Sequence, residues 1–418
     1  MERIHKLPVS FLIGFNSLYL GVNYLWISFE SLILPTQIGA IVPESRMGLI
    51  LGITAALGAG SGIAGNLSSG FLGDRFRILG SKRSPYVAIG VSLALVSVLI
   101  DGFLSNIIAT IVLAYMLLQV FSNVAIGSIQ PVIAEAIGPE QRGVSAGING
   151  LFTLTGSALG FGLTGYLMTY YSQEAAIYSI AGGLLITGVG ALVTLASKQI
   201  SQERLHSIRV SSLRHMPPDL RAFRGLTSGA FLVFMGITGL TYFELYFFKQ
   251  ILDVPDPQIY VAIAGIVVLA LSAIASIILG HFSDRIGRWR ILIITAAFSA
   301  VPTAMIPYFR SFGVFLVLGS LIGVSYGTFY SVSSALAGDL VPKKEAGKYM
   351  AIFNLSLSGA STVSPLAYGA ILFMLSANVH LSYVALFSAS ALFYLSGSAT
   401  IFRASRNSGV VGHSGMAG

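Results

Sequence analysis

Two glutamates interrupt long apolar stretches of the chain, and a carboxyl group in such a place can bind a proton or a cation. Glu30 and Glu244 lie within runs that are long enough to cross a bilayer. A charged side chain at mid-bilayer costs about 2.5–3.5 kcal/mol on insertion scales, so it usually faces a cavity or a partner. We predict that both acids are coupling sites. Two alternatives stay open: Glu30, five residues before Pro35, lies near the outer interface, or Glu244 neutralises Lys249.

Polar and aromatic side chains recur at helical spacing around these acids. Asn16, Asn23 and Glu30 are seven residues apart, and at 100° per residue they share one helix face with Tyr19 and Trp26. Similar stripes occur at Tyr115, Gln119, Asn123, Gly127 and Gln130, at Tyr242, Tyr246 and Lys249, and at Tyr326, Tyr330 and Ser333. Amides and aromatic rings suit hydrogen bonding to hydroxyl groups and ring stacking. We therefore predict a small neutral or weakly polar solute as the ligand.

The composition requires that these stripes lie in a membrane protein. The chain is 55% hydrophobic and 10% charged, with mean hydropathy +0.81, whereas a soluble domain carries about 25% charged residues. We predict an all-α polytopic fold and read the first apolar run as a retained span, because it is longer than a signal-peptide core. The twelve predicted spans are 8–34, 47–72, 85–104, 106–134, 146–170, 175–197, 226–252, 259–282, 291–309, 312–337, 349–376 and 381–402.

The basic residues predict the orientation of these spans. If the N-terminus is cytoplasmic, 21 of the 24 Lys and Arg residues fall on the cytoplasmic side, and only Arg46, Lys249 and Arg310 fall elsewhere. This positive-inside bias predicts a multi-pass protein of the cell membrane with both termini in the cytoplasm. It also accounts for the net charge of +8 without a nucleic-acid partner.

Several kinds of chemistry are not supported by the residues. The chain has no cysteine, its six histidines are scattered, and it has no P-loop, so we expect no metal, no cofactor and no ATP hydrolysis. A membrane enzyme would need clustered Asp and His, or Ser and His, at one interface, and the sequence has no such cluster. A sensor without transport would be expected to carry a signalling domain. We therefore expect that the chain is not an enzyme.

Two motifs recur about 210 residues apart and indicate an internal duplication. Gly70 precedes Asp74-Arg75 by four residues, and Gly280 precedes Asp284-Arg285 in the same way, each before a basic cluster. An acid, a proline, a charged turn and a glycine also recur near Pro139 and Pro342. We predict a six-helix bundle over 1–196, a basic linker over 197–225, a second bundle over 226–402 and a disordered tail over 403–418.

This doubled arrangement resembles the major facilitator superfamily. The longer first copy, with Gly80 to Tyr86, resembles the sugar:cation symporter branch. The resemblance implies two bundles that alternately open a central site to each side, lined by spans 1, 4, 7 and 10. It also implies that motif residues hold the cytoplasmic side closed in one state, although their charges could serve topology alone. By this resemblance the gating residues are Asp74, Arg75, Arg142, Asp284 and Arg285.

Two departures from family patterns bear on the direction of transport. Phe161 stands where the antiporter signature has proline, and the fourth span lacks the buried arginine common in proton-driven drug exporters. Both departures weaken the alternative reading, which is proton-driven efflux of amphipathic compounds. We predict proton-coupled uptake of a sugar-like or small polar solute. The expected partners are this solute, protons and the lipid bilayer, and we expect a monomer.

Overall fold

The chain forms two compact helical units. The computed structural model describes residues 6–75, 83–197, 220–342 and 345–407, and the side chains of 71–75, 134, 135, 139 and 407 also lie outside this description. The first unit comprises Met1–Pro43, Thr54–Ile208 and Val261–Ile263. The second comprises Glu44–Ile53, Arg209–Tyr260 and Ala264–Gly418. The first seven residues of the second predicted span, 47–53, therefore belong with the second unit.

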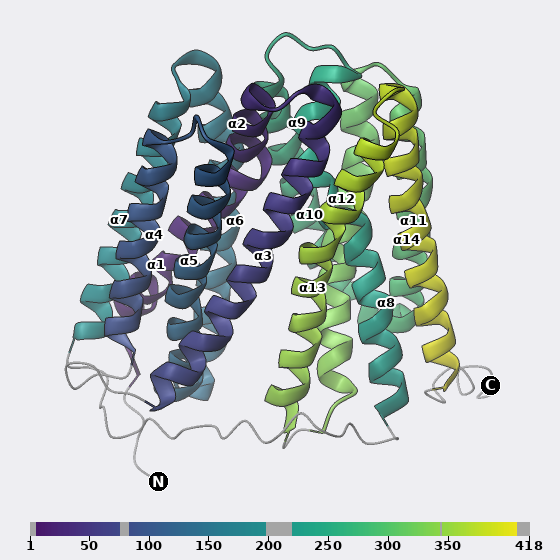
Figure 1. Ribbon diagram of the computed structural model, residues 1–418. Coiled ribbons are helices and arrows are strands. Elements are labelled where there is room, and N and C mark those ends of the chain that lie inside the picture. Colours follow the sequence, from purple (N-terminus) through teal and green to yellow (C-terminus); the bar gives the residue numbers. More distant parts are fainter. Residues whose placement is uncertain (1–5, 76–82, 198–219, 343–344, 408–418) are drawn as a thin grey trace, which may run out of the picture. The chain divides into compact units, whose positions relative to one another are not determined.

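The first unit is built from long apolar helices that pack in pairs. Helix α1 packs against α6 and α7, and α4 packs against α5 and α7 (Figure 1). In α4 and α7 these contacts bury one face and leave apolar residues such as Val96 and Ile186 exposed on the other, as expected for helices in lipid. The elements of this part of the chain are α1 (Val9–Ser28), η1 (Phe29–Ile33), α2 (Leu34–Ile41), α3 (Glu44–Arg75), α4 (Ser84–Phe103), α5 (Ile108–Ala136), α6 (Pro139–Tyr170) and α7 (Gln173–Ala196).

The first span passes through Pro35 without ending. Proline lacks an N–H group, and its ring would clash with the carbonyl group of the residue four positions earlier in a regular helix. The chain widens into the π-helical turn η1, in which the N–H of Leu34 bonds to the carbonyl of Phe29. The helix then continues to Ile41, seven residues beyond the predicted end. Glu30 lies inside this π-turn rather than at the end of the span.

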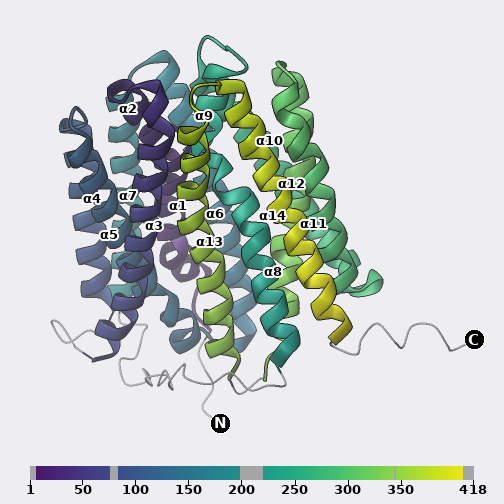
Figure 2. The same cartoon turned by 45° about the vertical axis from the view of Figure 1, so that its right-hand side comes forward.

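The second unit repeats the same kind of packing. Helix α8 lies between α13 and α14, and α11 packs against α12 and α14 (Figure 1 and Figure 2). The elements are α8 (Arg221–Thr238), α9 (Leu240–Gln250), α10 (Pro257–Ile286), α11 (Arg288–Met305), η4 (Ile306–Tyr308), α12 (Phe312–Asp339), α13 (Ala346–Met374) and α14 (Val379–Asn407). Helix α8 begins inside the predicted linker, and α14 extends into the predicted tail. The remainder of the linker, 198–219, and of the tail, 408–418, lies outside the described residues.

Glycine permits the closest helix contacts in both units. A Cβ atom on Gly65 of α3 would lie 2.4 Å from the carbonyl oxygen of Val120 on α5. A Cβ atom on Gly327 of α12 would lie 2.1 Å from the carbonyl oxygen of Ser272 on α10. Since no real Cβ atom approaches an oxygen this closely, only glycine allows these helix backbones to approach at these points.

The predicted fold class is confirmed. Within the described residues, twelve helical segments are long and apolar enough to cross a membrane. They correspond one to one with the twelve predicted spans, although several begin or end a few residues away. The seventh is divided at Gly239 into α8 and α9, and the ring of Tyr368 lies against this glycine.

Candidate functional site

The polar stripe of α5 meets Glu30 in the first unit. Gln119 is buried, and its amide nitrogen donates to the hydroxyl oxygen of Tyr115 at 2.8 Å and to a carboxylate oxygen of Glu30 at 3.4 Å. A side-chain amide nitrogen carries two hydrogens, which is enough for both acceptors. The side chain of Asn123 donates to the backbone carbonyl of Gln119 at 2.9 Å and to its amide oxygen at 3.4 Å. The predicted stripe is therefore a connected polar network that includes an ionisable group.

Trp26 connects α1 to the same region of α5. Its indole nitrogen donates to the hydroxyl oxygen of Ser122 at 2.9 Å, and the ring is half-buried. Trp26 and Glu30 are four residues apart and both reach α5, so this face of the first span is the one that meets the polar stripe. Asn23 instead bonds along its own helix, with its amide nitrogen 2.7 Å from the carbonyl oxygen of Tyr19.

Asn16 has a different environment from the rest of its stripe. It is fully buried, and its side chain donates to Ser145 of α6 at 3.1 Å and to the Leu12 carbonyl at 2.8 Å. Asn149 of α6 donates to the Asn16 side chain at 3.5 Å. These contacts connect α1 to α6.

Tyr19 lines a cavity of about 500 Å³ within the first unit. The cavity is bounded by α1, α5 and α6, through Gln130 on α5 and through Arg142 and Asn149 on α6. Arg142 is exposed, and its Nε donates to the carbonyl oxygen of Ile137 at 3.2 Å. A guanidinium group, two amides and a phenol thus surround one cavity in this unit.

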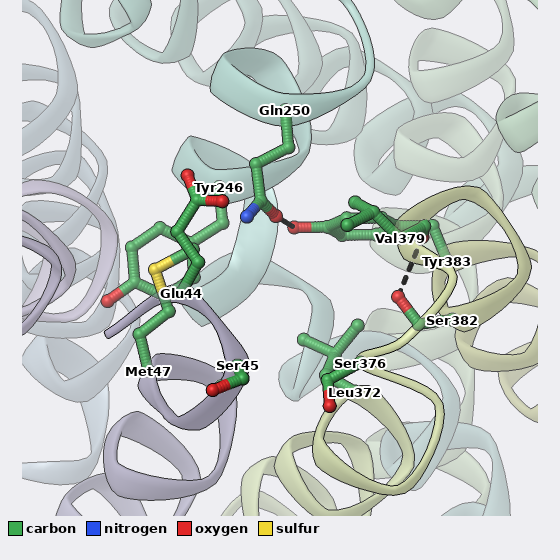
Figure 3. A pocket seen from close by; sticks show the side chains of 11 residues that line it. Glu44, Ser45, Met47, Tyr246, Gln250, Leu372, Ser376, Val379, Ser382 and Tyr383 are labelled. Carbon is green, nitrogen blue, oxygen red and sulfur yellow. Dashed lines mark hydrogen bonds between the residues drawn. The ribbon is translucent and has the colours of Figure 1, made fainter. Parts of the chain in front are cut away.

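The second unit places aromatic side chains where the first places amides. Tyr242 and Tyr246 are both buried on α9. Tyr246 lines a cavity of about 260 Å³ together with Glu44 of α3 and Gln250, whose amide oxygen accepts a 2.7 Å bond from Tyr383 (Figure 3). Figure 3 shows Tyr246 and Glu44 on one side of this cavity and Tyr383 on the other.

Glu244 has no polar partner in this aromatic setting. It is half-buried on α9, and among the described residues it makes no hydrogen bond or ion pair. The residues three and four positions later, Phe247 and Phe248, are buried and pack against Phe315. Side chains at these spacings share a helix face, so the Glu244 carboxyl has rings beside it.

Tyr326 and Tyr330 on α12 form an aromatic group with Phe234 of α8. The ring of Phe234 lies 5.8 Å from that of Tyr326 and 6.1 Å from that of Tyr330. Tyr326 is half-buried, whereas Tyr330 is 50% exposed. Of the two hydroxyl groups, that of Tyr330 belongs to the more accessible side chain.

The second copy of the duplicated motif forms ion pairs through a residue that the sequence did not single out. Arg288, at the start of α11, bonds to Asp284 at 2.8 Å and also pairs with Asp339 at the end of α12. Arg285 is exposed, and the partner of Asp284 is Arg288 instead. Gly287, with φ of 101°, separates α10 from α11 and places Arg288 at the beginning of the next helix. The three charged groups therefore connect the ends of α10, α11 and α12.

The first copy of the motif lies at the end of α3. Residues Asp74 and Arg75 end α3, but their side chains lie outside the described residues, as do residues 76–82.

Sequence reasoning also overlooked Asp101 and Gln37, two buried residues that bond to each other. Asp101 carries the same signal as Glu30, namely an acid within an apolar span. Within the described residues, no group of three or more His, Cys, Asp or Glu could hold a metal ion.

The sequence matches a known family over most of its length. Residues 10–365, and separately 226–409, match the Major Facilitator Superfamily. Two curated relatives are similar over shorter stretches. A Na(+), Li(+), K(+)/H(+) antiporter of Planococcus maritimus is 32% identical over 107 residues, which are 24% of this chain and 25% of that protein. An uncharacterised protein of Geobacillus stearothermophilus, named for the region 3' of sodM, is 25% identical over 134 residues, 32% of this chain and 61% of that protein.

Several solved transporter structures have a similar fold. A bacterial homologue of the human lysosomal transporter Spinster, inward-facing and occupied, has a TM-score of 0.72 at 13% identity, covering 95% of this chain and 96% of that one. A nucleoside transporter has a TM-score of 0.72 at 13% identity, with coverage of 95% and 99%. A D-xylose–proton symporter has a TM-score of 0.69 at 18% identity, with coverage of 92% and 96%. At these identities the similarity shows the fold alone.

Proposed function

We propose, because the chain belongs to the Major Facilitator Superfamily, that this multi-pass membrane transporter takes up a small polar solute together with protons. It would act as a monomer by alternating access, and the favoured solutes are sugar-like molecules. The observation that carries the proposal is the bond from Gln119 to Glu30, because it connects an ionisable carboxyl to a network of amide and hydroxyl groups. A solute that bonds to this network would therefore sense whether Glu30 carries a proton.

Glu30 suits the role of a coupling acid. An ionised carboxylate accepts hydrogen bonds only, whereas the protonated acid also donates one. Adding a proton therefore changes which hydrogen bonds Glu30 can form with Gln119 and with a nearby solute hydroxyl. The π-turn around Glu30 supports this role, because single π-turns within helices occur frequently at functional sites.

The solute class follows from the side chains around Glu30. Gln119, Asn123 and Trp26 offer amide and indole groups that can donate to or accept from hydroxyl oxygens. The tyrosines of the second unit, including Tyr246 and Tyr330, offer rings and phenol groups. The D-xylose–proton symporter and the nucleoside transporter of similar fold handle hydroxyl-bearing solutes, which is consistent with this proposal.

Glu244 is proposed as a second coupling acid, of a different kind. Because it has no hydrogen-bond partner among the described residues, its charge would have little compensation beside Phe247 and Phe248. Burying an uncompensated charge is unfavourable, so such a group tends to bind a proton instead. We propose that Glu244 releases its proton only in a conformation that gives the carboxyl access to water.

We also propose that the duplicated motifs gate the cytoplasmic side. In the second copy, Asp284 and Asp339 both pair with Arg288, which supports a charged contact that can form and break. Asp74, Arg75 and Arg142 would act similarly in the first copy, and Arg285 would assist in the second. Both termini would lie in the cytoplasm. Cysteines introduced at the exposed residues Glu140 and Ala377 of this cysteine-free chain test that orientation, because an impermeant maleimide added outside cells should label only Ala377→Cys.

A second candidate function is proton-coupled antiport of a monovalent cation. It is favoured by the stretch of 107 residues that is 32% identical to a Na(+), Li(+), K(+)/H(+) antiporter. That stretch covers only a quarter of the antiporter, so it supports the candidate less than the polar network supports symport. Efflux of amphipathic compounds remains a further outcome of the test below.

The experiment is transport by purified protein in liposomes with a pH-sensitive dye inside and an imposed inward proton gradient. A panel of sugars and small polar solutes is added, followed by Na⁺, Li⁺ and K⁺ salts and by hydrophobic dyes. Acidification that depends on one solute class would support symport. Alkalinisation by a cation that leaves the solute panel without effect would replace symport with antiport, and movement of dyes alone would replace it with efflux.

Matched variants connect the signal to the site. Glu30→Gln should lose solute-dependent acidification, because glutamine cannot bind a proton at this position. Glu174→Gln is the control, since Glu174 is an exposed acid on the first turn of α7 in the same unit. Equal losses in the two variants would remove Glu30 from the proposed mechanism.

A further inference from the structure

A buried acid and a buried amide pair with each other where α4 meets α2. Asp101, in the last turn of α4, is 0% exposed, and Gln37 of α2 is 3% exposed. The amide nitrogen of Gln37 donates to Oδ2 of Asp101 at 2.7 Å. The two remaining oxygens, Oδ1 of Asp101 and Oε1 of Gln37, are buried and have no hydrogen-bond partner among the described residues.

The described helices that pack around Asp101 carry no positive charge. Helix α4 packs against α5 and α7, and neither of these helices contains a Lys or Arg residue; nor do α1, η1 and α2. The titratable groups on these elements are otherwise acids and phenols. They are Tyr19, Tyr24 and Glu30 in the first span, Tyr115 and Glu135 on α5, and Glu174 and Tyr178 on α7. Among the described residues, the only group that bonds to the Asp101 carboxyl is the neutral amide of Gln37.

One proton would satisfy both remaining oxygens. An ionised Asp101 would leave two acceptors, Oδ1 and Oε1, on adjacent groups with no donor between them. A protonated carboxyl can donate, and the amide that already gives its N–H to Oδ2 also carries the unpaired acceptor Oε1. The pair would then have two complementary hydrogen bonds, which removes the cost of leaving buried polar atoms unpaired.

We propose that the Asp101–Gln37 pair is a proton-binding site, separate from Glu30, in which protonated Asp101 donates to the amide oxygen of Gln37. Gln37 is seven residues beyond Glu30, on the other side of the π-turn from α1. Without the proton, the bond from Gln37 to Oδ2 would persist, but Oδ1 and Oε1 would both be acceptors with no donor among the described residues. The role of this site in transport rests on the proposed function, but the presence of the proton does not.

Infrared spectroscopy of the full chain in lipid tests the site without transport. At about pH 7, exposed carboxyls with ordinary pKa values near 4 are ionised, so a carboxylic-acid carbonyl band reports protonated groups. Subtracting the Asp101→Asn spectrum from the wild-type spectrum should leave the band of one carboxylic acid. The control is Asp256→Asn, which removes an exposed aspartate. Subtracting its spectrum from the wild-type spectrum should leave only carboxylate bands. Asparagine has the shape of the protonated acid and can donate to Gln37 in the same way.

A second variant tests the partner. Gln37→Leu removes the donor to Oδ2, so the carboxylic-acid band of Asp101 should persist and move to higher frequency. If Gln37 only filled space beside Asp101, the frequency of this band should not change in Gln37→Leu. Carboxylate bands alone in the Asp101→Asn subtraction would overturn the proposal, and carboxylate bands that change between Na⁺ and choline buffers would replace the proton with a metal cation.

The transport assay separates this inference from the proposed function. If the carboxylic-acid band is present but the protein shows no proton-coupled uptake, the proton site at Asp101 stands and the proposed function fails. If uptake is coupled to protons but the band is absent, the proposed function stands and the proton site at Asp101 fails.

Discussion

The two units place their membrane acids in opposite environments. In the first unit, Glu30 and Asp101 each bond to the amide of a glutamine on another helical element. In the second, Glu244 has aromatic neighbours and no polar partner among the described residues. An acid bonded to an amide can pass on its protonation state through a hydrogen bond, whereas an isolated acid changes only its own charge. The two units therefore share long apolar helices that pack in pairs but differ in the chemistry around their acids.

Glu30→Gln should give the largest effect. Net uptake that acidifies the liposome requires the acid to release its proton inside, which glutamine cannot do, so this signal should fall to the background of empty liposomes. Solute exchange between two equally loaded sides needs no net proton movement and should continue. The measurement is net uptake and exchange in parallel on one preparation. A variant that loses both, while still folded, would mean that Glu30 binds the solute rather than coupling it.

Glu244→Gln should also reduce coupling, but without altering the hydrogen-bond network of the first unit. We expect slower net uptake and an unchanged KM for exchange, because the substitution removes a proton site and breaks no bond among the described residues. Its unfolding temperature should not fall below that of the wild type. A higher KM would show that Glu244 also contributes to solute binding.

Gln119→Leu tests whether the polar network of the first unit binds the solute. It removes the donor to both Glu30 and Tyr115. If the solute bonds to the Gln119 amide, leucine also removes that bond. The loss of one hydrogen bond costs about 0.5–1.5 kcal/mol, which corresponds to roughly a 2- to 13-fold rise in the KM for the solute. Gln250→Leu removes the corresponding amide of the second unit, which accepts from Tyr383, and should leave KM unchanged. Equal effects of the two substitutions would contradict the division of roles.

Glycine packing should be equally important in both units. Gly65→Ala and Gly327→Ala each force a Cβ atom against a backbone oxygen, and such overpacking costs about 1–3 kcal/mol. Gly147→Ala and Gly338→Ala are the controls, because a Cβ atom there meets nothing within 4 Å. Thermal unfolding in detergent compares the four variants. Similar unfolding temperatures for test and control variants would refute the close contacts.

The smallest expected effect on stability belongs to the charged group of Asp284, Arg288 and Asp339. Both aspartates are largely exposed, and exposed ion pairs contribute only about 0–1 kcal/mol. Asp284→Asn should therefore slow transport while leaving solute affinity and the unfolding temperature nearly unchanged. Arg290→Gln, at an exposed residue two positions after Arg288, is the control. Wild-type transport rates in Asp284→Asn would remove the gating role of this group.

The sequence predicts the fold well because each span is a long apolar run whose crossing length is set by the membrane. It also predicts that Gln119 and Asn123 act together, since residues four apart on a helix are neighbours. It does not predict the surroundings of Asn16, because periodicity gives the face of a helix but not which helix covers it. In the structure α6 covers Asn16.

Local backbone changes account for the other differences. Pro35 normally indicates the end of a helix, but the π-turn before it lets the helix continue to Ile41, so that Glu30 lies well inside the span. Arg288 pairs with Asp284 across the break at Gly287, from the start of the next helix. The Asp101–Gln37 pair joins residues 64 positions apart, and the sequence contains no pattern that connects them.

The central claim is that one acid, Glu30, responds to both the proton and the solute. The most direct test is the solute affinity of purified protein measured over a series of pH values, for the wild type and for Glu30→Gln. Because linkage between two ligands is reciprocal, a proton that favours solute binding should make the wild-type affinity fall as pH rises. The Glu30→Gln variant should bind with an affinity that does not change with pH. An equal pH dependence in both proteins would contradict the account.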